Sequence, residues 1–223
     1  MKNRAGFTLA ELILSVFIFS FIAASLATIV STTNRHMFQN YRRNVLKTNV
    51  LLSMRRVQNN LSVATRIDLP LAGARNTSLA FAVNVDQTTG CYPISAADPA
   101  SWHYFCLAKD KLYYHTGPIT GSGSATACGK PTPSIWCANN PISGSCYAVP
   151  SCGGTGGTLL MEHVSPFLTG ALFSRHYLDG INEVDTVRVA LRSLWSASAS
   201  GFGASQRDIN STLDTVIRLN RSK

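Results

Sequence analysis

The sequence predicts an α+β fold, in which one long amino-terminal α-helix packs on antiparallel β-sheet. Three observations predict it. No proline or glycine interrupts residues 7–67, and beyond them short runs alternate apolar and polar residues between turn-forming residues. Most of the six cysteines fall in a segment rich in Gly, Ser and Pro, residues 117–157, which we expect to be an insertion held by disulfide bonds.

The uninterrupted stretch divides into two parts. Residues 7–30 are apolar with Glu11 as their only charge, and such a run is long enough to cross a bilayer as a helix, which takes about 20 residues. Residues 31–67 continue at helical spacing as an amphipathic helix with two apolar series, ended by Pro70 and Gly73. The first series is Phe38, Tyr41, Val45, Thr48 and Leu52, and the second is Val50, Met54, Val57, Leu61 and Ala64.

Residues 68–223 are expected to form one β-rich globular domain. The predicted strands cover residues 79–85, 103–107, 111–115, 158–164, 171–177, 186–194 and 213–219. Lys109 and Asp110 provide a turn between the second and third strands. Residues 117–157 form a Cys- and Gly-rich loop region within this domain.

A short basic leader precedes the apolar run. Lys2 and Arg4 come first and the small pair Ala5-Gly6 follows, whereas a secretory signal peptide has its small-residue cleavage site after the apolar region. The stretch from Gly6 to Glu11, GFTLAE, resembles the class III leader junction of type IV pilin-like proteins. This resemblance implies that a prepilin peptidase removes residues 1–6 by cutting after Gly6, and that Phe7 becomes the N-methylated first residue.

Glu11 needs an explanation because a carboxylate in an apolar segment is costly without a partner. In the resembled family the corresponding acid meets the free amine of a neighbouring subunit, here the amine of Phe7. Pairing would offset the cost of burying either charge alone. The alternative places Glu11 at the cytosolic interface, near headgroup water and the positive end of the helix dipole. We favour the assembly role.

The order of a long helix followed by strands is also similar to the pilin architecture. Residues 160–167, 185–191 and 215–220 resemble the carboxy-terminal half of the larger minor pilins and minor pseudopilins. The membrane helix lacks the proline that major pilins often carry there. The resemblance implies a minor pilin or pseudopilin that primes or caps a type IV pilus-like filament, at its tip or base. Its expected partners are other minor and major pilins or pseudopilins, prepilin peptidase, the inner-membrane assembly platform and membrane lipid.

The sequence gives two opposing indications of the side of the membrane on which the body lies. The chain has 20 Lys and Arg against 11 Asp and Glu, with a formal net charge of +9. No acid lies between Glu11 and Asp68, so the positive-inside rule would place the body in the cytosol. The basic residues in that interval are Arg35, Arg42, Arg43, Lys47, Arg55, Arg56 and Arg66. The leader resemblance and the cysteines favour the opposite: a single-pass protein of the bacterial inner membrane with a periplasmic body.

Six cysteines allow fifteen pairings. We favour the sequential set, because short loops bring neighbours together most easily. That set is Cys91–Cys106, Cys128–Cys137 and Cys146–Cys152.

The sequence leaves open the kind of filament and one alternative function of the body. The filament is either a type IV pilus or the pseudopilus of type II secretion, and the body could instead serve as an adhesive or DNA-binding module of an uptake pilus. DNA is the less favoured partner, because basic residues on a helical stalk are more often neutralised by neighbouring helices or lipid headgroups.

No catalytic set, cofactor site or metal site is predicted. Residues 124–131 lack a glycine and the Ser/Thr of a phosphate loop, and the histidines form no H-E-x-x-H pair. The cysteine spacing does not fit zinc knuckles. The acids of residues 179–185 could ligate calcium but depart from EF-hand spacing, so a solvated loop is favoured. We expect a structural protein rather than an enzyme.

Overall fold

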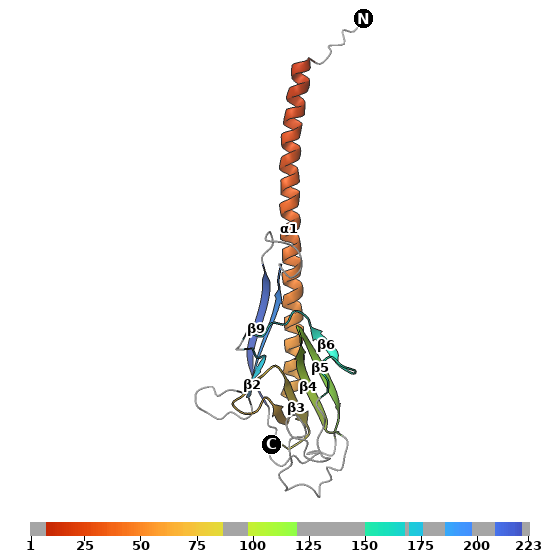
Figure 1. The fold of residues 1–223 in the computed structure, drawn as a ribbon, viewed down its shortest axis with the longest axis vertical. Coiled ribbons are helices and arrows are strands. Elements are labelled where there is room, and N and C mark those ends of the chain that lie inside the picture. The colour runs from red at the N-terminus through yellow and green to blue at the C-terminus, as the bar shows by residue number, and fades with distance from the viewer. Residues whose placement is uncertain are drawn as a thin grey trace. The chain divides into compact units, whose positions relative to one another are not determined.

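The computed structural model describes residues 8–86, 98–119, 150–167, 170–175, 186–197 and 208–219. The chain divides into two compact units, Met1–Asn44 and Val45–Lys223. The elements in chain order are α1 (Leu9–Ser62), β1 (Arg66–Leu69), β2 (Arg75–Asn76), β3 (Leu79–Val83), β4 (Ser101–Ala108), β5 (Lys111–Pro118), β6 (Thr158–Met161), β7 (Phe173–Ser174), β8 (Thr186–Trp195) and β9 (Ile209–Arg218). The predicted α+β class, with one long helix and antiparallel sheets, is confirmed (Figure 1).

The first unit is the amino-terminal part of α1. Its apolar side chains from Leu9 to Val30 are exposed all around the helix, a distribution suited to lipid rather than water. Its hydroxyl groups donate to carbonyl oxygens three or four residues earlier, at 2.7–2.9 Å. The donors are Ser15, Ser20, Ser25, Thr28 and Thr32. Each of these five hydroxyl groups is thus satisfied inside the helix, as a hydrocarbon environment requires.

The helix ends at Ser62, earlier than the predicted residue 67. Residues 66–69 form β1 instead, which pairs antiparallel with β3. The Thr65 N–H donates to the Ala82 carbonyl at 2.9 Å, and the Thr65 hydroxyl donates to the Val85 carbonyl at 2.7 Å. Pairing with a distant strand therefore ends the helix here, and no proline or glycine is needed.

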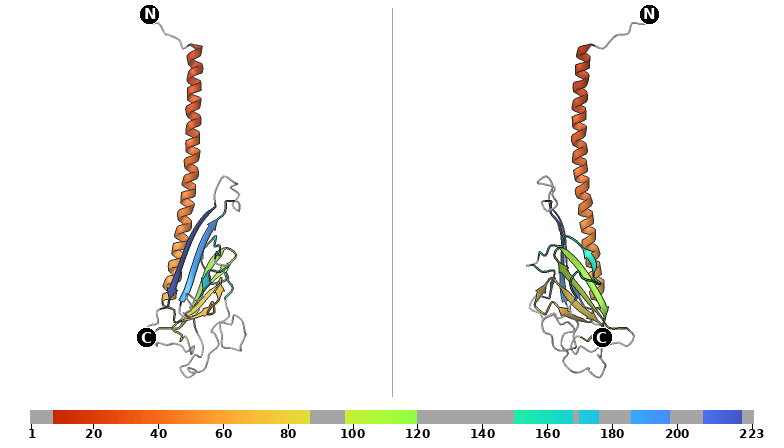
Figure 2. Two further views of the ribbon diagram at one scale, coloured as in Figure 1. Left: turned by 90° about the vertical axis from the view of Figure 1, so that its left-hand side faces the viewer. Right: turned by 45° about the vertical axis from the view of Figure 1, so that its right-hand side comes forward.

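In the described residues of the body, the strands form two antiparallel sheets. One has the order β1-β3-β4-β5-β6 and the other β2-β7-β8-β9. The predicted strands each correspond to one of these elements, and the turn at Lys109-Asp110 joins β4 to β5 as expected. The short strands β1 and β2 were not predicted. The longest pair, β8 with β9, runs side by side over ten residues of each strand (Figure 2).

The second apolar series of the helix supplies its contribution to the core. Val50, Met54, Val57 and Leu61 are at most 1 % exposed and belong to one cluster with side chains from both sheets. Among the sheet residues of this cluster are Phe81, Phe105, Leu112, Phe173, Val187 and Leu191. The carboxy-terminal part of α1 thus packs on both sheets, as its amphipathic spacing predicts.

Candidate functional site: the amino-terminal junction

The start of α1 is closed by a reciprocal pair of side chains, Thr8 and Glu11. The Thr8 backbone N–H and hydroxyl both donate to Glu11 Oε2, at 2.9 and 3.0 Å. In return the Glu11 backbone N–H donates to Thr8 Oγ1 at 3.3 Å. This is a capping box, in which a Thr at the N-cap and a Glu three residues later satisfy each other's backbone donors. The spacing T-x-x-E was visible in the sequence, but its meaning as a helix start was missed.

The capping box leaves part of Glu11 available. Both hydrogen bonds that the carboxylate accepts reach Oε2, and in the described part of the chain Oε1 accepts none. The Glu11 side chain is exposed. It can therefore hold the helix terminus through one oxygen and receive a further donor through the other. Gly6 and Phe7 lie outside the described residues, so the cleavage junction itself has no described geometry.

The comparison with protein families adds independent support for this junction. Residues 1–27 match the family model for the prokaryotic N-terminal methylation motif, a range that includes Gly6, Phe7 and Glu11. The comparisons with curated proteins and with solved structures gave no significant match. The motif together with the long helix and antiparallel sheets supports a type IV pilin-like protein. Type IV pilin-like proteins are structural subunits.

The first part of α1 fits a membrane anchor. Leu9–Ser62 is long and apolar enough to cross a bilayer, and its most apolar window has no buried residue. Together with the methylation motif, this helix fits a single-pass anchor in the inner membrane.

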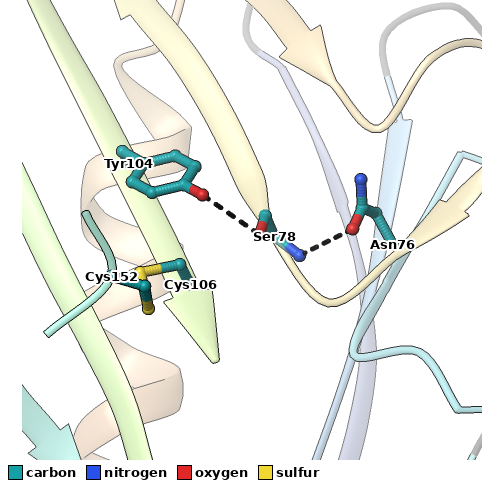
Figure 3. Close-up of a disulfide and its surroundings, with 5 residues drawn as sticks. All are labelled: Asn76, Ser78, Tyr104, Cys106 and Cys152. Carbon is teal, nitrogen blue, oxygen red and sulfur yellow. Dashed lines mark hydrogen bonds between the residues drawn. A yellow bond between two sulfur atoms is a disulfide. The ribbon is translucent and has the colours of Figure 1, made fainter. Parts of the chain in front are cut away.

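The body carries one described disulfide, and it corrects the predicted pairing. Cys106 of β4 is bonded to Cys152 across 46 residues of sequence, with Cα atoms 5.9 Å apart (Figure 3). The predicted bonds Cys91–Cys106 and Cys146–Cys152 are therefore wrong. Cys91, Cys128, Cys137 and Cys146 lie outside the described residues, and so does the predicted bond Cys128–Cys137.

The predicted pairing is wrong because it was based on short separation in sequence, whereas the fold brings Cys152 next to Cys106 on the sheet. Cys106 is buried in a small cluster with Ala80, Ala82 and Tyr104, and Cys152 packs against that cluster. Beside it, the Tyr104 hydroxyl donates to Ser78 Oγ at 3.3 Å, and the Ser78 N–H donates to Asn76 Oδ1 (Figure 3). The bond fixes the carboxy-terminal end of the 117–157 region to the five-stranded sheet.

Packing around residues 153–157 reinforces that attachment. A Cβ atom at Gly157 would lie 2.6 Å from Cε1 of the buried His115, and one at Gly153 would lie 3.1 Å from the Tyr113 ring. Gly153 also has φ +76°, a conformation that side chains disfavour. These two glycines allow the segment to lie directly on β5.

A polar cluster lies between α1 and the five-stranded sheet. His103 Nδ1 is 2.7 Å from the Tyr114 hydroxyl, and its Nε2 is 3.2 Å from Ser101 Oγ. The Tyr114 hydroxyl lies 3.4 Å from Asn60 Oδ1, and the Arg56 guanidinium lies over the Tyr114 ring, 5.2 Å from its centroid. Burial, reinforced by the Arg56 charge, lowers the pKa of His103 to about 4, and burial raises the pKa of Tyr114. Both groups stay uncharged at neutral pH and connect helix to sheet.

No metal site emerges from the described residues, among which no three His, Cys, Asp or Glu side chains gather in a ligating group. The acidic cluster of residues 179–185 lies outside them. His103 and His115 are on neighbouring strands but take part in packing, as described above. His163 lies 3.6 Å from Asp110 at the surface.

Proposed function

We propose that this protein is a minor pilin or minor pseudopilin that primes or caps a type IV pilus-like filament. The proposal rests on the methylation motif over residues 1–27. This range includes the start of α1, whose first turn presents the Glu11 carboxylate. In this account a prepilin peptidase cuts between Gly6 and Phe7, and Phe7 becomes the N-methylated terminus. The body lies in the periplasm, and the disulfide Cys106–Cys152 supports that compartment, because disulfides persist in oxidising environments.

Cleavage would change the electrostatics of the junction. It creates an ammonium group at Phe7, which within an apolar helix bundle needs a negative partner. Glu11 of an adjacent subunit supplies that charge, and its Oε1 is available while Oε2 holds the capping box. Each subunit thus brings one amine and one carboxylate, and assembly satisfies both.

The capping box allows a sharp test of this role. Glu11→Gln keeps the capping geometry, since glutamine serves equally at this position of the box, but it removes the charge. Glu11→Leu removes both, and Glu11→Asp keeps the charge on a shorter side chain. If charge pairing drives assembly, Gln and Leu variants should both insert in the membrane and both be depleted from sheared filament fractions. Incorporation of the Gln variant at the parental level would reject the pairing and leave Glu11 with a capping role alone.

Two measurements distinguish a pilus from a secretion pseudopilus: the fraction in which the protein is found after shearing, and the effect of deleting its coding region on exoprotein secretion. Co-sedimentation with surface pili would indicate a pilus subunit. Retention in the envelope, with loss of exoprotein secretion on deletion of the coding region, would indicate a pseudopilin.

A further inference from the structure

Strand β9 is an edge of the four-stranded sheet, because the strand order is β2-β7-β8-β9. It pairs with β8 along its full ten residues without a shift in register, and it lies at the outer margin of the body in Figure 1. The opposite edge, β2, has two residues. In the five-stranded sheet, the edges β1 and β6 have four residues each, and both pairings contain an irregularity in register. Of the sheet edges that the structure describes, β9 is therefore the long and regular one.

The neighbouring strand shows which backbone groups of β9 point outward. On β8, the N–H groups of Ala190 and Leu194 donate to carbonyl oxygens of Leu172 and His163, on the side away from β9, at 2.9 and 2.8 Å. Because the backbone groups of an antiparallel strand alternate between its two sides, the odd-numbered residues of β8 bond to β9. Their partners on β9 are odd-numbered too. The N–H and C=O groups that point away from β8 are therefore those of Asn210, Thr212, Asp214, Val216 and Arg218.

The outward groups of β9 have no partner in the part of the chain that the structure describes. Beyond the ladder with β8, no hydrogen bond reaches the backbone of residues 209–218. Proteins commonly protect an edge strand with proline, lysine or a bulge, since an exposed edge accepts further strands. Residues 209–218 contain no proline, glycine or lysine, and their pairing has no bulge. The edge therefore offers a regular row of main-chain donors and acceptors.

We propose that β9 binds an extended segment of another protein, which adds to the four-stranded sheet as an antiparallel fifth strand. Main-chain hydrogen bonds provide the attachment in this mode of recognition, and side chains provide the specificity. Antiparallel pairing is slightly more stable per residue than parallel pairing. The inference goes beyond the proposed function, because it assigns to the body a binding site for a partner.

The side chains of β9 define the chemistry of that partner. Leu213 and Ile217 are partly buried and pack against the main core, so an added strand extends this face best with apolar residues. On the other face, Val216 is 46 % exposed. Arg218 is exposed and forms no ion pair with the residues that the structure describes, whereas Asp214 is bound by Arg188 at 2.6 Å. The partner segment therefore alternates apolar and polar residues and carries a carboxylate opposite Arg218.

A second copy of this chain does not fit as that partner. Strand β9 runs in the same general direction as residues 45–62 of α1 (Figures 1 and 2). Subunits whose helices share one direction in a filament therefore hold their β9 strands parallel, and an antiparallel pair of β9 strands needs one copy to be reversed. This step rests on the proposed function.

A peptide with the sequence of residues 208–218 is a suitable probe, because it has the required pattern. Aligned antiparallel on β9, it places its Asp208 opposite Arg218 and its Ile209 opposite Ile217. A shift of two residues sets Asp214 against Asp214, which like charges disfavour. Fluorescence anisotropy measures binding of the labelled peptide to the full-length protein in lipid nanodiscs that hold one copy each.

Two N-methylated peptides test the main-chain ladder without changing the protein. In the expected alignment, the peptide N–H groups at Thr212 and Asp214 face β9, and those at Ser211 and Leu213 face away. Methylation of the facing pair should weaken binding by about tenfold or more, because two main-chain hydrogen bonds are lost. Methylation of the other pair should leave the affinity close to that of the unmodified peptide. Equal affinities of the two methylated peptides, or no saturable binding of the unmodified one, would overturn the proposal.

Two further measurements test the chemistry of the partner and the alternative occupant. Arg218→Glu should weaken peptide binding by about two- to fivefold, and a peptide with Asp208→Lys should recover it. In membranes, differently tagged copies carrying Asn210→Cys and Val216→Cys should form no mixed disulfide. Such a disulfide would overturn the proposal in favour of a second copy. An unprocessed leader would count against the proposed function but would leave peptide binding unchanged, so the two failures are separable.

Discussion

The Thr8 backbone N–H donates to Glu11 Oε2 across 2.9 Å, so the carboxylate expected to meet a neighbouring subunit also caps its own helix. The two roles use different features of one side chain: capping needs an acceptor oxygen, whereas subunit pairing needs a negative charge. The helix can therefore begin at Leu9 before assembly, with Glu11 already held four residues from the terminus that the proposed cleavage after Gly6 would create.

The Thr8 hydroxyl should stabilise the first turn of α1. Thr8→Val removes the oxygen that accepts the Glu11 N–H at 3.3 Å and should weaken the helix start by about 1 kcal/mol. Faster hydrogen exchange at the amides of residues 9–12, in detergent-solubilised protein, would show this. Thr8→Ser is the matched control and should exchange like the parent.

The Cys106–Cys152 bond should stabilise the body substantially. It closes a loop of 46 residues, which in the chain-entropy model corresponds to about 4 kcal/mol of unfolding free energy. We expect the double variant Cys106→Ser/Cys152→Ser to unfold at clearly lower denaturant concentration than the parent under non-reducing conditions. A transition unchanged by both this variant and a reductant would contradict the assigned bond.

Stability should fall in mild acid. His103 has its pKa lowered to about 4 by burial and by Arg56, and burial lowers the pKa of His115 as well. The unfolded chain therefore binds protons at these histidines near pH 6.5 while the folded chain does not, so stability is full above that pH and is lost as pH falls toward 4. Denaturant titrations at pH 7.5 and pH 4.5 measure the loss. His103→Gln should reduce it, and His115 should account for part of the remainder.

The two apolar faces of α1 should respond differently to truncation. Leu61→Ala removes a fully buried side chain and should cost about 2–5 kcal/mol. Leu52→Ala removes a side chain that is 57 % exposed and should cost less than about 0.5 kcal/mol. Thermal melts of the detergent-solubilised protein compare them. Equal losses would mean that the first apolar series, to which Leu52 belongs, is covered within the isolated chain.

Sequence periodicity could establish that α1 has two apolar faces but not which one the body covers. That choice depends on the strands that gather around Val50, Met54, Val57 and Leu61, and their positions follow from long-range pairing. The same limit explains β1, because residues 66–69 join a sheet through β3 rather than through a local signal. The pairing of Cys106 with Cys152 likewise reflects folded proximity, which overrides sequence separation.

Sequence patterns that depend only on neighbouring residues predicted the structure better than those that depend on long-range contacts. The leader order, the uninterrupted helix and the alternating strands each depend on nearby residues, and they predicted the fold class and the amino-terminal motif correctly. The capping box at Thr8 and Glu11 is equally local and could have been identified from T-x-x-E.

The mass of the mature protein tests the central claim most directly. Intact-mass and amino-terminal peptide spectra of membrane-derived or assembled protein should show loss of residues 1–6 and one added methyl group on Phe7. Gly6→Ala should leave substantial processing because alanine is nearly as small as glycine, and Gly6→Val should block it. A mature protein that retains Met1, or one cut after the apolar segment near Ser31, would contradict the assignment as a pilin-like filament subunit.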